Sequence, residues 1–533
     1  MSQRNPLDAI IIGAGFAGMQ LLHRLRGAGF RVRVLEAAAD VGGTWYHNCY
    51  PGARCDVESL QYAYQFSEEL QQEWEWTERF ATQPEILNYA NHVADRFDLR
   101  RDIDFKRRVS SAHYDEASCY WTVATEDGQV VQAHHCIMAT GCLSSASTPD
   151  IPGLEDFRGE LYHTGQWPKD NVDFAGRRVA VIGTGSSGIQ VIPELAKQAQ
   201  HLTVFQRTAC YSVPARNAPL TAQAIGTVKA KYAAFREANK AEWGGVSYPR
   251  GISKVSALEV SNDQREEEFN IRWEIGGVGF LSAFSDLMFS PEANEYASEF
   301  VRNKIRSIVH DPETAATLCP DFPVGCKRIC LDTDYYATFN RDNVSLVSLR
   351  EQPIGRITRR GLVIGDRVFD FDDIVFATGF DAITGALLNM DIRGRGGLTL
   401  REKWASGPSN YLGLATSGFP NLFLVTGPGS PSVLTNMLVS IDQHVSWIGD
   451  CLEYIRAQQI NSIEADAEAE IAWMEQVDAI VKYTLFSGCN SWYTGANLDG
   501  KPKGFMPYAG GLPMYTQLCN EVAQNNYRGF SLN

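Results

Sequence analysis

The sequence contains one supersecondary pattern twice, about 170 residues apart. Each copy is an apolar strand, a glycine-rich turn, an amphipathic helix and a second strand: DAIIIGAGFAGMQLLHRLRGAGFRVRVLEA, then RRVAVIGTGSSGIQVIPELAKQAQHLTVFQRT. A strand that runs through such a turn into a helix opens a doubly wound parallel sheet. The repeat therefore predicts an α/β fold with two Rossmann-like dinucleotide-binding domains in one chain.

The first glycine-rich turn, GAGFAG at 13–18, matches G-x-G-x-x-G. The first glycine makes the turn, the second lets the backbone approach a pyrophosphate, and the third lets the helix pack on the strand. The helix N-terminus adds amide donors and a positive dipole. Glu36 ends the next strand, 21 residues after Gly15, where a carboxylate accepts hydrogen bonds from ribose hydroxyls. This turn predicts a cofactor with an unphosphorylated ribose.

The second turn, GTGSSG at 183–188, has the same glycine spacing but a different ending. The residue 21 positions after Gly185 is Gln206, and Arg207 follows it. A carboxylate would repel a ribose 2′-phosphate, whereas an arginine pairs with it. The second turn therefore predicts NADPH. The strand ends CIMATG (136–141) and IVFATG (374–379) are expected to cross close to the cofactors.

Between Pro214 and about Asp321 the pattern changes to long amphipathic helices such as TAQAIGTVKAKYAAFREANKAEW. We read this segment, about 214–321, as a helical insertion in the second dinucleotide-binding unit. The expected division is a FAD-binding domain formed by 1–145 and 379–533, with the NADPH-binding domain at 146–378 between its two parts.

Charge and cysteine content narrow the class of protein. The formal net charge of -15 argues against nucleic acid or an anionic membrane as partner. No signal peptide and no apolar run long enough to span a bilayer is evident, which is typical of a cytoplasmic protein. The 12 cysteines include no C-x-x-C pair, so we expect reduced, mostly buried thiols and no metal site.

Two dinucleotide sites in one chain suggest a flavin that takes hydride from a nicotinamide. A disulfide reductase would need a redox dithiol near the first unit. Such enzymes resemble the stretch GGTWYHNCY (42–50) but have one cysteine directly after Gly-Gly-Thr and another five residues later. Those positions are Trp45 and Tyr50 here, so a dithiol reductase is not predicted.

The connector before the second turn carries a more specific signal. Its defined positions spell F-x-G-x-x-x-H-x-x-x-W-P and are Phe157, Gly159, His163, Trp167 and Pro168. At every one of them the chain resembles the signature of the Baeyer–Villiger monooxygenases. It also resembles that family in G-G-T-W-Y-x-N-x-Y-P-G-x-x-x-D, from Gly42 to Asp56. Related N- and S-oxygenating flavin monooxygenases usually lack the Trp-Pro ending, so the resemblance favours the Baeyer–Villiger class.

By this resemblance, NADPH reduces FAD, dioxygen adds at flavin C4a, and the peroxyflavin converts a ketone to an ester or lactone. The family places the arginine of a Lys-Arg pair beside the peroxide, where a cation stabilises the developing anion. The matching pair is Lys327-Arg328, with Arg328 expected at the flavin and Lys327 at the NADPH 2′-phosphate. Asp56 is expected to fix Arg328, and a helix-capping role for Asp56 is the alternative.

The resemblance and the motifs together define the candidate site residues. The catalytic residues are Arg328 and Asp56. The expected FAD contacts are Gly13, Gly15, Phe16, Ala17, Gly18, Glu36, Gly43, Thr44, Trp45, Asp56 and Met437. The expected NADPH contacts are Gly183, Thr184, Gly185, Ser186, Ser187, Gly188, Arg207, Thr208, Lys327, Arg328 and Trp492. The expected substrate pocket contains Cys142, Ser432, Val433 and Leu434.

Three alternatives stay open at this point. An N- or S-oxygenating monooxygenase or an NADPH oxidase would use the same two cofactors with a different outcome. A non-enzymatic flavin redox sensor would bind FAD without ketone-dependent NADPH consumption. His163 either transmits domain rotation or only fixes the path of the connector. The expected small-molecule partners are a ketone and dioxygen, and the oligomeric state, with a monomer as one option, is left open.

The first turn together with Glu36 generates a simple expectation. The purified protein should be yellow and carry tightly bound FAD, because the turn and the acid supply both pyrophosphate and ribose contacts. The visible absorption spectrum and the released flavin check this. A colourless protein that FAD cannot reconstitute would contradict the assignment of a flavin.

Overall fold

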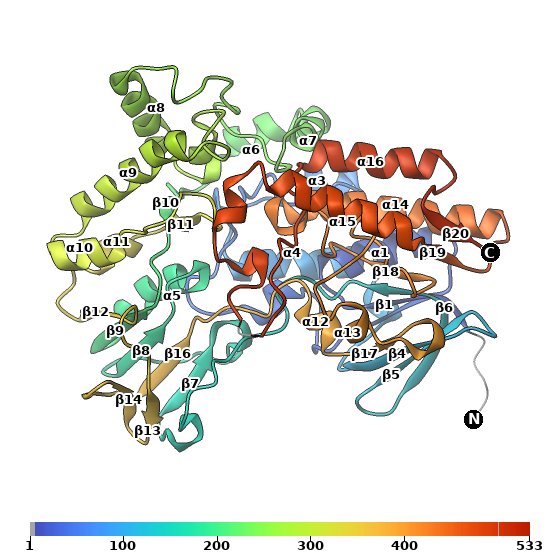
Figure 1. Cartoon of the computed structure of the whole chain (residues 1–533), viewed down its shortest axis with the longest axis horizontal. Coiled ribbons are helices and arrows are strands. Elements are labelled where there is room, and N and C mark those ends of the chain that lie inside the picture. The colour runs from blue at the N-terminus through green and yellow to red at the C-terminus, as the bar shows by residue number, and fades with distance from the viewer. Residues whose placement is uncertain (1–5, 499) are drawn as a thin grey trace.

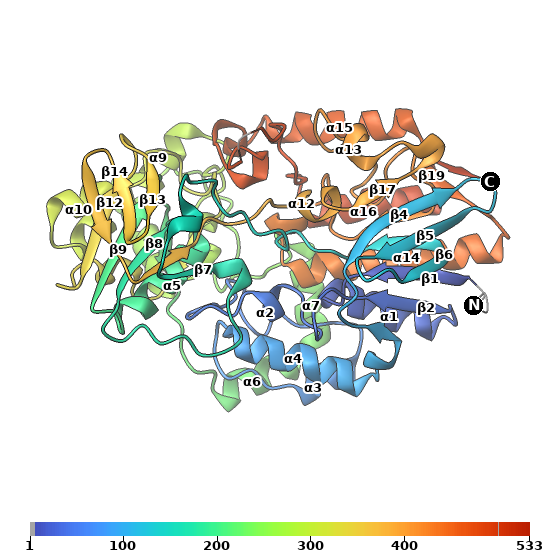
Figure 2. The same cartoon turned by 90° about the horizontal axis from the view of Figure 1, so that it is seen from below.

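The computed structural model describes residues 6–498 and 500–533, and they form two lobes, each built on its own sheet (Figures 1 and 2). The first sheet runs in the order β17-β4-β5-β6-β1-β2-β3, with β18 also pairing with β6. Its strands are β1 (Leu7–Ile12), β2 (Val32–Leu35), β3 (Ile103–Asp104), β4 (Val109–Asp115), β5 (Tyr120–Thr125), β6 (Val130–Met138), β17 (Asp391–Arg393) and β18 (Leu422–Leu424). The late strands β17 and β18 thus complete the sheet that the N-terminal segment begins.

The second sheet is parallel throughout, in the order β12-β9-β8-β16-β7. Its strands are β7 (Glu160–His163), β8 (Arg178–Ile182), β9 (His201–Gln206), β12 (Val344–Ser348) and β16 (Asp373–Phe376). Smaller sheets join β10 (Ser212–Pro214) with β11 (Cys330–Asp332), β13 (Arg356–Thr358) with β14 (Gly361–Ile364) and β15 (Arg367–Asp370), and β19 (Ile463–Ala465) with β20 (Phe530–Leu532). Both predicted Rossmann-like units are therefore present.

Each glycine-rich turn feeds a helix that packs on its sheet, α1 in the first lobe and α5 in the second. In the first lobe α14 packs along α1, and Arg24 of α1 pairs with Asp450 of α14. The helices outside the insertion are α1 (Phe16–Gly27), α2 (Thr44–His47), α3 (Glu68–Glu73), α4 (Gln83–Arg96), α5 (Ser186–Ala196), α11 (Tyr335–Thr338), α12 (Gly385–Leu388), α13 (Leu400–Lys403), α14 (Met437–Ala457), α15 (Ala467–Val481) and α16 (Leu512–Gln524).

The predicted insertion consists of α6 (Ala222–Lys229), α7 (Tyr232–Ala241), α8 (Asn262–Ile275), α9 (Pro291–Ile308) and α10 (Pro312–Leu318). It does not belong to one lobe alone. Helices α8, α9 and α10 share a core with the second sheet, whereas Arg236 of α7 is buried against the first lobe and donates to the carbonyl of Gln61 at 3.2 Å. The insertion therefore bridges the two lobes, which helical periodicity could not indicate.

The connector with the sequence signature forms β7 and the chain just after it. Gly159 has no room for a side chain, since a Cβ there would lie 2.2 Å from the Asp372 carbonyl oxygen and 2.6 Å from the Phe157 ring. Phe157 and Trp167 are buried on the second lobe, and Trp167 packs 6.1 Å from Phe174 between ring centroids. The aromatic residues of the signature thus fix the connector against the second lobe.

The cysteines correct one expectation. Cys326 and Cys489 form a disulfide with their Cα atoms 6.0 Å apart, so the expectation of thiols that are all reduced was wrong for this pair. The two cysteines are separated by 163 residues, and a pairing between such distant positions has no spacing signature in the sequence. The remaining cysteines in the described residues are free thiols, six of them buried and four partly buried.

Within residues 6–498 and 500–533, no helix is long and apolar enough to cross a membrane. The same residues contain no cluster of three or more histidine, cysteine or acidic side chains placed to hold a metal ion.

The packing around Gly159 gives a stability prediction. Gly159→Ala should lower the free energy of unfolding by roughly 1–3 kcal/mol, because overpacking displaces the neighbouring backbone and ring. The matched control is Gly226→Ala in α6, where a Cβ meets open space and alanine favours the helix by roughly 0.5–1 kcal/mol. Urea midpoints of the two variants should therefore shift in opposite directions, and an unchanged midpoint for Gly159→Ala would contradict the steric explanation.

Candidate active site

The first glycine-rich turn is closed by the backbone that crosses it. Gly13 has φ +105°, and a Cβ there would lie 2.6 Å from the carbonyl oxygen of Ala139, the residue that begins the first Ala-Thr-Gly turn. Gly15 faces Gly43, where a Cβ would lie 2.8 Å from the Gly15 Cα. The first glycine-rich turn, the Ala-Thr-Gly turn and the chain at Gly43 thus meet without side chains between them. Helix α1 begins at Phe16, and no side chain caps its free amides.

Glu36 lies beside this turn and is buried. Its carboxylate accepts from the amide of Ala14 at 2.5 Å and from the amide of Ala38 at 2.6 Å. Burial raises the pKa of Glu36, while the two amide donors act to lower it. A buried acid held by the turn's own backbone is placed to receive a ribose hydroxyl at the end of β2.

The second turn repeats this geometry. Gly183 has φ +112°, and a Cβ there would lie 2.4 Å from the carbonyl oxygen of Ala377, which begins the second Ala-Thr-Gly turn. Gly185 differs, because a Cβ there would meet nothing within 4 Å. Gly185 and Ser186 are exposed at the start of α5, which also lacks a side-chain cap. Open space at uncapped helix amides suits a bound pyrophosphate.

At the end of β9, the adjacent side chains of Gln206 and Arg207 differ in their exposure to solvent. Gln206 is buried and donates to the carbonyl of Thr317 at 2.7 Å, so its side chain is directed into the insertion. Arg207 and Thr208 are exposed, and the Thr208 carbonyl accepts from the Thr184 hydroxyl at 3.0 Å. The exposed cation, and not the residue at the acid position, is therefore available to a ligand.

Lys327 lies near Arg207. Burial lowers the pKa of Lys327, and the positive charge of Arg207 acts in the same direction. The Lys327 ammonium stands 4.2 Å over the Phe322 ring, while Asp321, its acidic neighbour, pairs with Arg350. Two cations gathered on the NADPH side favour an anionic ligand there.

Arg328 is directed the other way, toward the first lobe. Its Nε and Nη2 donate to the two Asp56 carboxylate oxygens at 2.7 and 2.9 Å, and its Nη1 donates to the Val433 carbonyl at 2.7 Å. Burial acts to lower the pKa of Arg328, but the charge of Asp56 outweighs it and the pKa is raised above its ordinary value. The structure thus brings Arg328, Asp56 and Val433 together, and Asp56 engages the arginine.

Two tyrosines at this centre were not among the predicted residues. Burial raises the pKa of Tyr493 to about 12, and its hydroxyl interacts with the Arg328 guanidinium. Burial also raises the pKa of Tyr248 to about 12, and Tyr248 lines one cavity with Asp56. Tyr493 follows Trp492 directly, so the SWYTGAN motif contained its signal, whereas Tyr248 lies in the insertion without a motif.

His163 of the signature lies where the connector meets the second Ala-Thr-Gly turn, 377–379. Its Nδ1 accepts from the amide of Gly165 at 3.0 Å, and its Nε2 lies 3.3 Å from both the Ser147 carbonyl and the Thr378 hydroxyl. Burial lowers the pKa of His163, which keeps the ring neutral at pH 7 with its proton on Nε2. The histidine therefore links the two chain segments that connect the lobes, one containing Ser147 and the other Thr378.

The predicted pocket residues form one buried cluster. The Cys142 thiol lies 3.1 Å from the Ser432 hydroxyl and donates to the Thr426 carbonyl at 3.4 Å. The cluster is apolar around this contact and contains Cys142, Val433, Leu434, Met437, Phe486, Trp492, Tyr493 and Phe505. Met437 and Trp492, predicted as cofactor contacts, are thus at the edge of the same cluster.

The Gly-Gly-Thr-Trp-Tyr segment forms α2 and the chain after it. Thr44 is exposed, and the Trp45 indole donates to the Tyr62 hydroxyl at 2.9 Å. The Cys49 thiol donates to the Trp167 and Pro168 carbonyls at 3.5 and 3.6 Å. This segment therefore contacts the signature connector, and it joins the first lobe to the start of the second.

The chain's own residues fit both cofactors. The first turn offers uncapped amides and a buried acid, and the second offers uncapped amides, open space and two cations. The opposite charges at the two strand ends suit an unphosphorylated ribose at the first turn and a phosphorylated ribose at the second.

Comparison with known proteins agrees with this geometry. Residues 10–248 match the family model for pyridine nucleotide-disulphide oxidoreductases. Phenazine N-monooxygenase of Lysobacter antibioticus is 43% identical over 100% of this chain and 98% of its own length. A Baeyer–Villiger monooxygenase of Pseudooceanicola batsensis is 41% identical over 98% of this chain and 95% of its own. Cyclohexanone 1,2-monooxygenase of Acinetobacter is 40% identical over 100% and 98%.

Solved structures show the same architecture. An oxidised steroid monooxygenase bound to NADP has a TM-score of 0.93 and 49% identity, covering 99% of both chains. OTEMO in complex with FAD and NADP has a TM-score of 0.96 and 39% identity, covering 99% of this chain and 100% of that one. The chain belongs to the Baeyer–Villiger monooxygenase family and is an FAD- and NADPH-dependent monooxygenase.

Proposed function

We propose that this enzyme oxygenates a ketone to an ester or lactone and that Arg328 is its catalytic cation. The observation that carries the proposal is the fixed guanidinium between Asp56 and Val433. FAD, reduced by NADPH, supplies the activated oxygen, and cyclohexanone, the ketone named for one 40% identical relative, illustrates the substrate class.

Arg328 suits the stabilisation of an oxyanion. A guanidinium stays protonated at any working pH and has five N–H donors in one plane. Asp56 and Val433 take three of these donors, which leaves two for Tyr493 and for the negative charge that develops on a ketone oxygen under attack. Donors fixed before the reaction need no reorganisation when the charge appears.

Val433 links the cation to the proposed substrate pocket. Its carbonyl holds Arg328, while its side chain belongs to the apolar cluster with Leu434 and Cys142. A ketone whose apolar body packs on this cluster would present its carbonyl toward the same wall that holds the guanidinium. The pocket polarity, with one thiol–hydroxyl contact between Cys142 and Ser432, suits a largely apolar ketone.

The two lobes divide the cofactors in this proposal. The lobe formed by 1–145 and 379–533 would hold FAD through the first turn, Glu36 and Met437, the first residue of α14. The lobe 146–378 would hold NADPH through the second turn, and Arg207 and Lys327 would pair with its 2′-phosphate. Trp492, at the edge of the pocket cluster, is proposed near the nicotinamide.

N-oxygenation is the second candidate, because a phenazine N-monooxygenase is 43% identical over the whole chain. Oxygen transfer to a ring nitrogen passes through no tetrahedral adduct of a carbonyl. The Asp56-fixed cation is the reason to prefer the ketone. Incubation with a panel of ketones and a phenazine, with products identified by mass spectrometry, distinguishes the two, and N-oxide without ester would overturn the ketone proposal.

The charge at the end of β9 predicts the nicotinamide preference. Arg207→Ala should raise the Michaelis constant for NADPH by roughly ten- to a hundred-fold, since one charge-assisted contact contributes about 1.5–3 kcal/mol, and change that for NADH little. The matched control is Arg341→Ala, an exposed arginine of the same lobe that hydrogen-bonds Asn343. Equal effects on both cofactors would show that Arg207 does not contact the 2′-phosphate.

The fixed guanidinium predicts that the half-reactions separate. Arg328→Ala should still reduce its flavin with NADPH and consume oxygen, but it should release hydrogen peroxide and lose ~10²–10³ in the rate of ester formation. Arg328→Lys should recover little, because a point charge on a flexible stem cannot replace the planar fork.

Stopped-flow flavin reduction and ester yield per NADPH measure the two halves of the reaction. Lys327→Ala is the contrast within the same pair, since it should weaken NADPH binding and keep the ester yield per NADPH. A wild-type ester yield in Arg328→Ala would place the catalytic cation elsewhere.

A further inference from the structure

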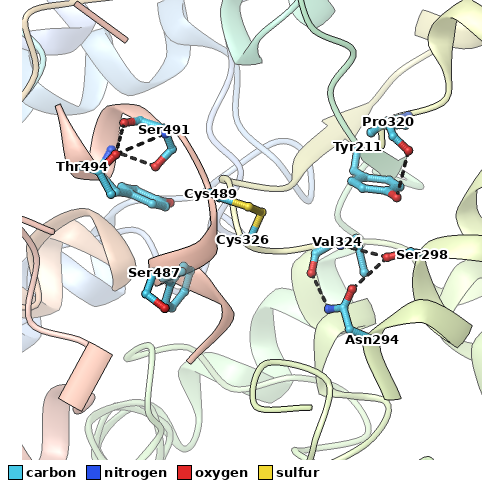
Figure 3. Close-up of a disulfide and its surroundings, with 12 residues drawn as sticks. Tyr211, Asn294, Ser298, Pro320, Val324, Cys326, Ser487, Cys489, Ser491 and Thr494 are labelled. Carbon is cyan, nitrogen blue, oxygen red and sulfur yellow. Dashed lines mark hydrogen bonds between the residues drawn. A yellow bond between two sulfur atoms is a disulfide. The ribbon is translucent and has the colours of Figure 1, made fainter. Parts of the chain in front are cut away.

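The disulfide joins two segments that each carry a residue of the catalytic centre. Cys326 precedes Arg328 by two residues, and Cys489 precedes Trp492 by three and Tyr493 by four. Figure 3 shows the bond crossing between the chain that follows the helical insertion and the C-terminal chain. The family signature and the cofactor contacts assign no role to either cysteine.

On the Arg328 side, the loop is already anchored up to the disulfide. Asn294 of α9 donates to the Val324 carbonyl at 2.8 Å, and the Val324 amide donates to the Ser298 hydroxyl at 3.0 Å (Figure 3). All these groups are buried, and Ser298 also donates to Asn294. Helix α9 therefore holds the chain in place two residues before Cys326.

On the Tyr493 side, the chain after Cys489 is a single turn of 3-10 helix, Trp492–Thr494. Ser491 and Thr494 close it with a capping box (Figure 3). The centroid of the Tyr493 ring lies 5.9 Å from that of Phe486 and 6.1 Å from that of Phe505. This turn presents the Tyr493 hydroxyl to the Arg328 guanidinium.

We propose that the Cys326–Cys489 bond is a positioning clamp that holds Arg328 and Tyr493 in register. The inference rests on the proposed role of Arg328. A covalent link between the two segments stops them from separating at Cys326 and Cys489, whereas the non-covalent Arg328–Tyr493 contact can break. Cys326 is fully buried and Cys489 is 6% exposed, so the bond is shielded from reductants and persists through turnover. Cys326 and Cys489 act through Arg328 and are positioning residues.

The clamp predicts a defect in oxygen transfer and not in flavin reduction. Cys326→Ser, Cys489→Ser and the double variant should each keep NADPH-dependent flavin reduction. Each should lose about ten- to a hundred-fold in the rate of ester formation, the scale expected when a catalytic group is displaced by about 1 Å. Because all three variants remove the same bond, the double variant should be no worse than either single one. Cys319→Ser, a free thiol seven residues before Cys326, is the matched control and should behave as wild type.

Two further measurements decide the proposal without catalysis. Alkylation of the unreduced holoenzyme followed by peptide mapping should leave Cys326 and Cys489 unlabelled and joined in one cross-linked peptide. Amide hydrogen exchange of the segments 324–330 and 489–496 should be faster in the cysteine variants than in wild type and in Cys319→Ser.

The outcomes separate this inference from the proposed function. Labelling of both cysteines without reduction, or wild-type exchange in the variants, overturns the clamp whatever the chemistry of Arg328. Faster exchange with a wild-type ester yield also overturns it, because the segments then loosen without consequence. If Arg328→Ala keeps its ester yield, the catalytic assignment fails, whereas faster exchange together with a lowered rate of ester formation in both cysteine variants still supports the clamp.

Discussion

The bidentate pair between Arg328 and Asp56 is the contact on which the proposed catalytic centre depends. It joins a residue that follows the helical insertion to one near the N-terminus, 272 positions apart, and so fixes where the lobes meet. A charge removed from water is costly unless it is paired and hydrogen-bonded. Asp56 and the Val433 carbonyl provide those partners, and the arginine stays cationic with donors to spare. The same contacts therefore stabilise the buried charge and hold the guanidinium in a fixed position.

The two glycine-rich turns show how one fold can bind two similar ligands selectively. Both are crossed by an Ala-Thr-Gly turn so closely that only glycine fits at Gly13 and Gly183. The difference lies in the charge at the end of the following strand, a buried acid at Glu36 and an exposed cation at Arg207. Steric constraint sets the shared geometry, and the opposite charges are the basis of the proposal that each turn accepts a different ribose.

The connectors between the lobes carry the signature for a structural reason. Gly159 passes against a backbone carbonyl, Trp167 packs into the second lobe, and His163 joins Ser147 to Thr378 where both chains cross. A neutral histidine at a crossing of two connectors fixes the path of the chain. Because both connectors leave the same point, any rotation of one lobe against the other would act on these hydrogen bonds.

The sequence by itself determined the two dinucleotide-binding units, the two cofactors and the position of the Lys327-Arg328 pair, because these depend on local spacing and on residue type. The strand, turn and helix of each unit follow one another in the chain, so the position of a glycine or a charged residue within them is enough to predict its role. Only the tertiary structure decided that Gln206 is directed inward, that α7 packs on the first lobe, and that Cys326 pairs with Cys489. It also brought Tyr493 to Arg328, and Tyr248 to the cavity that Asp56 lines. Each of these contacts joins positions far apart in the chain, and the packing of whole lobes brings such positions together without leaving a periodicity or spacing to read.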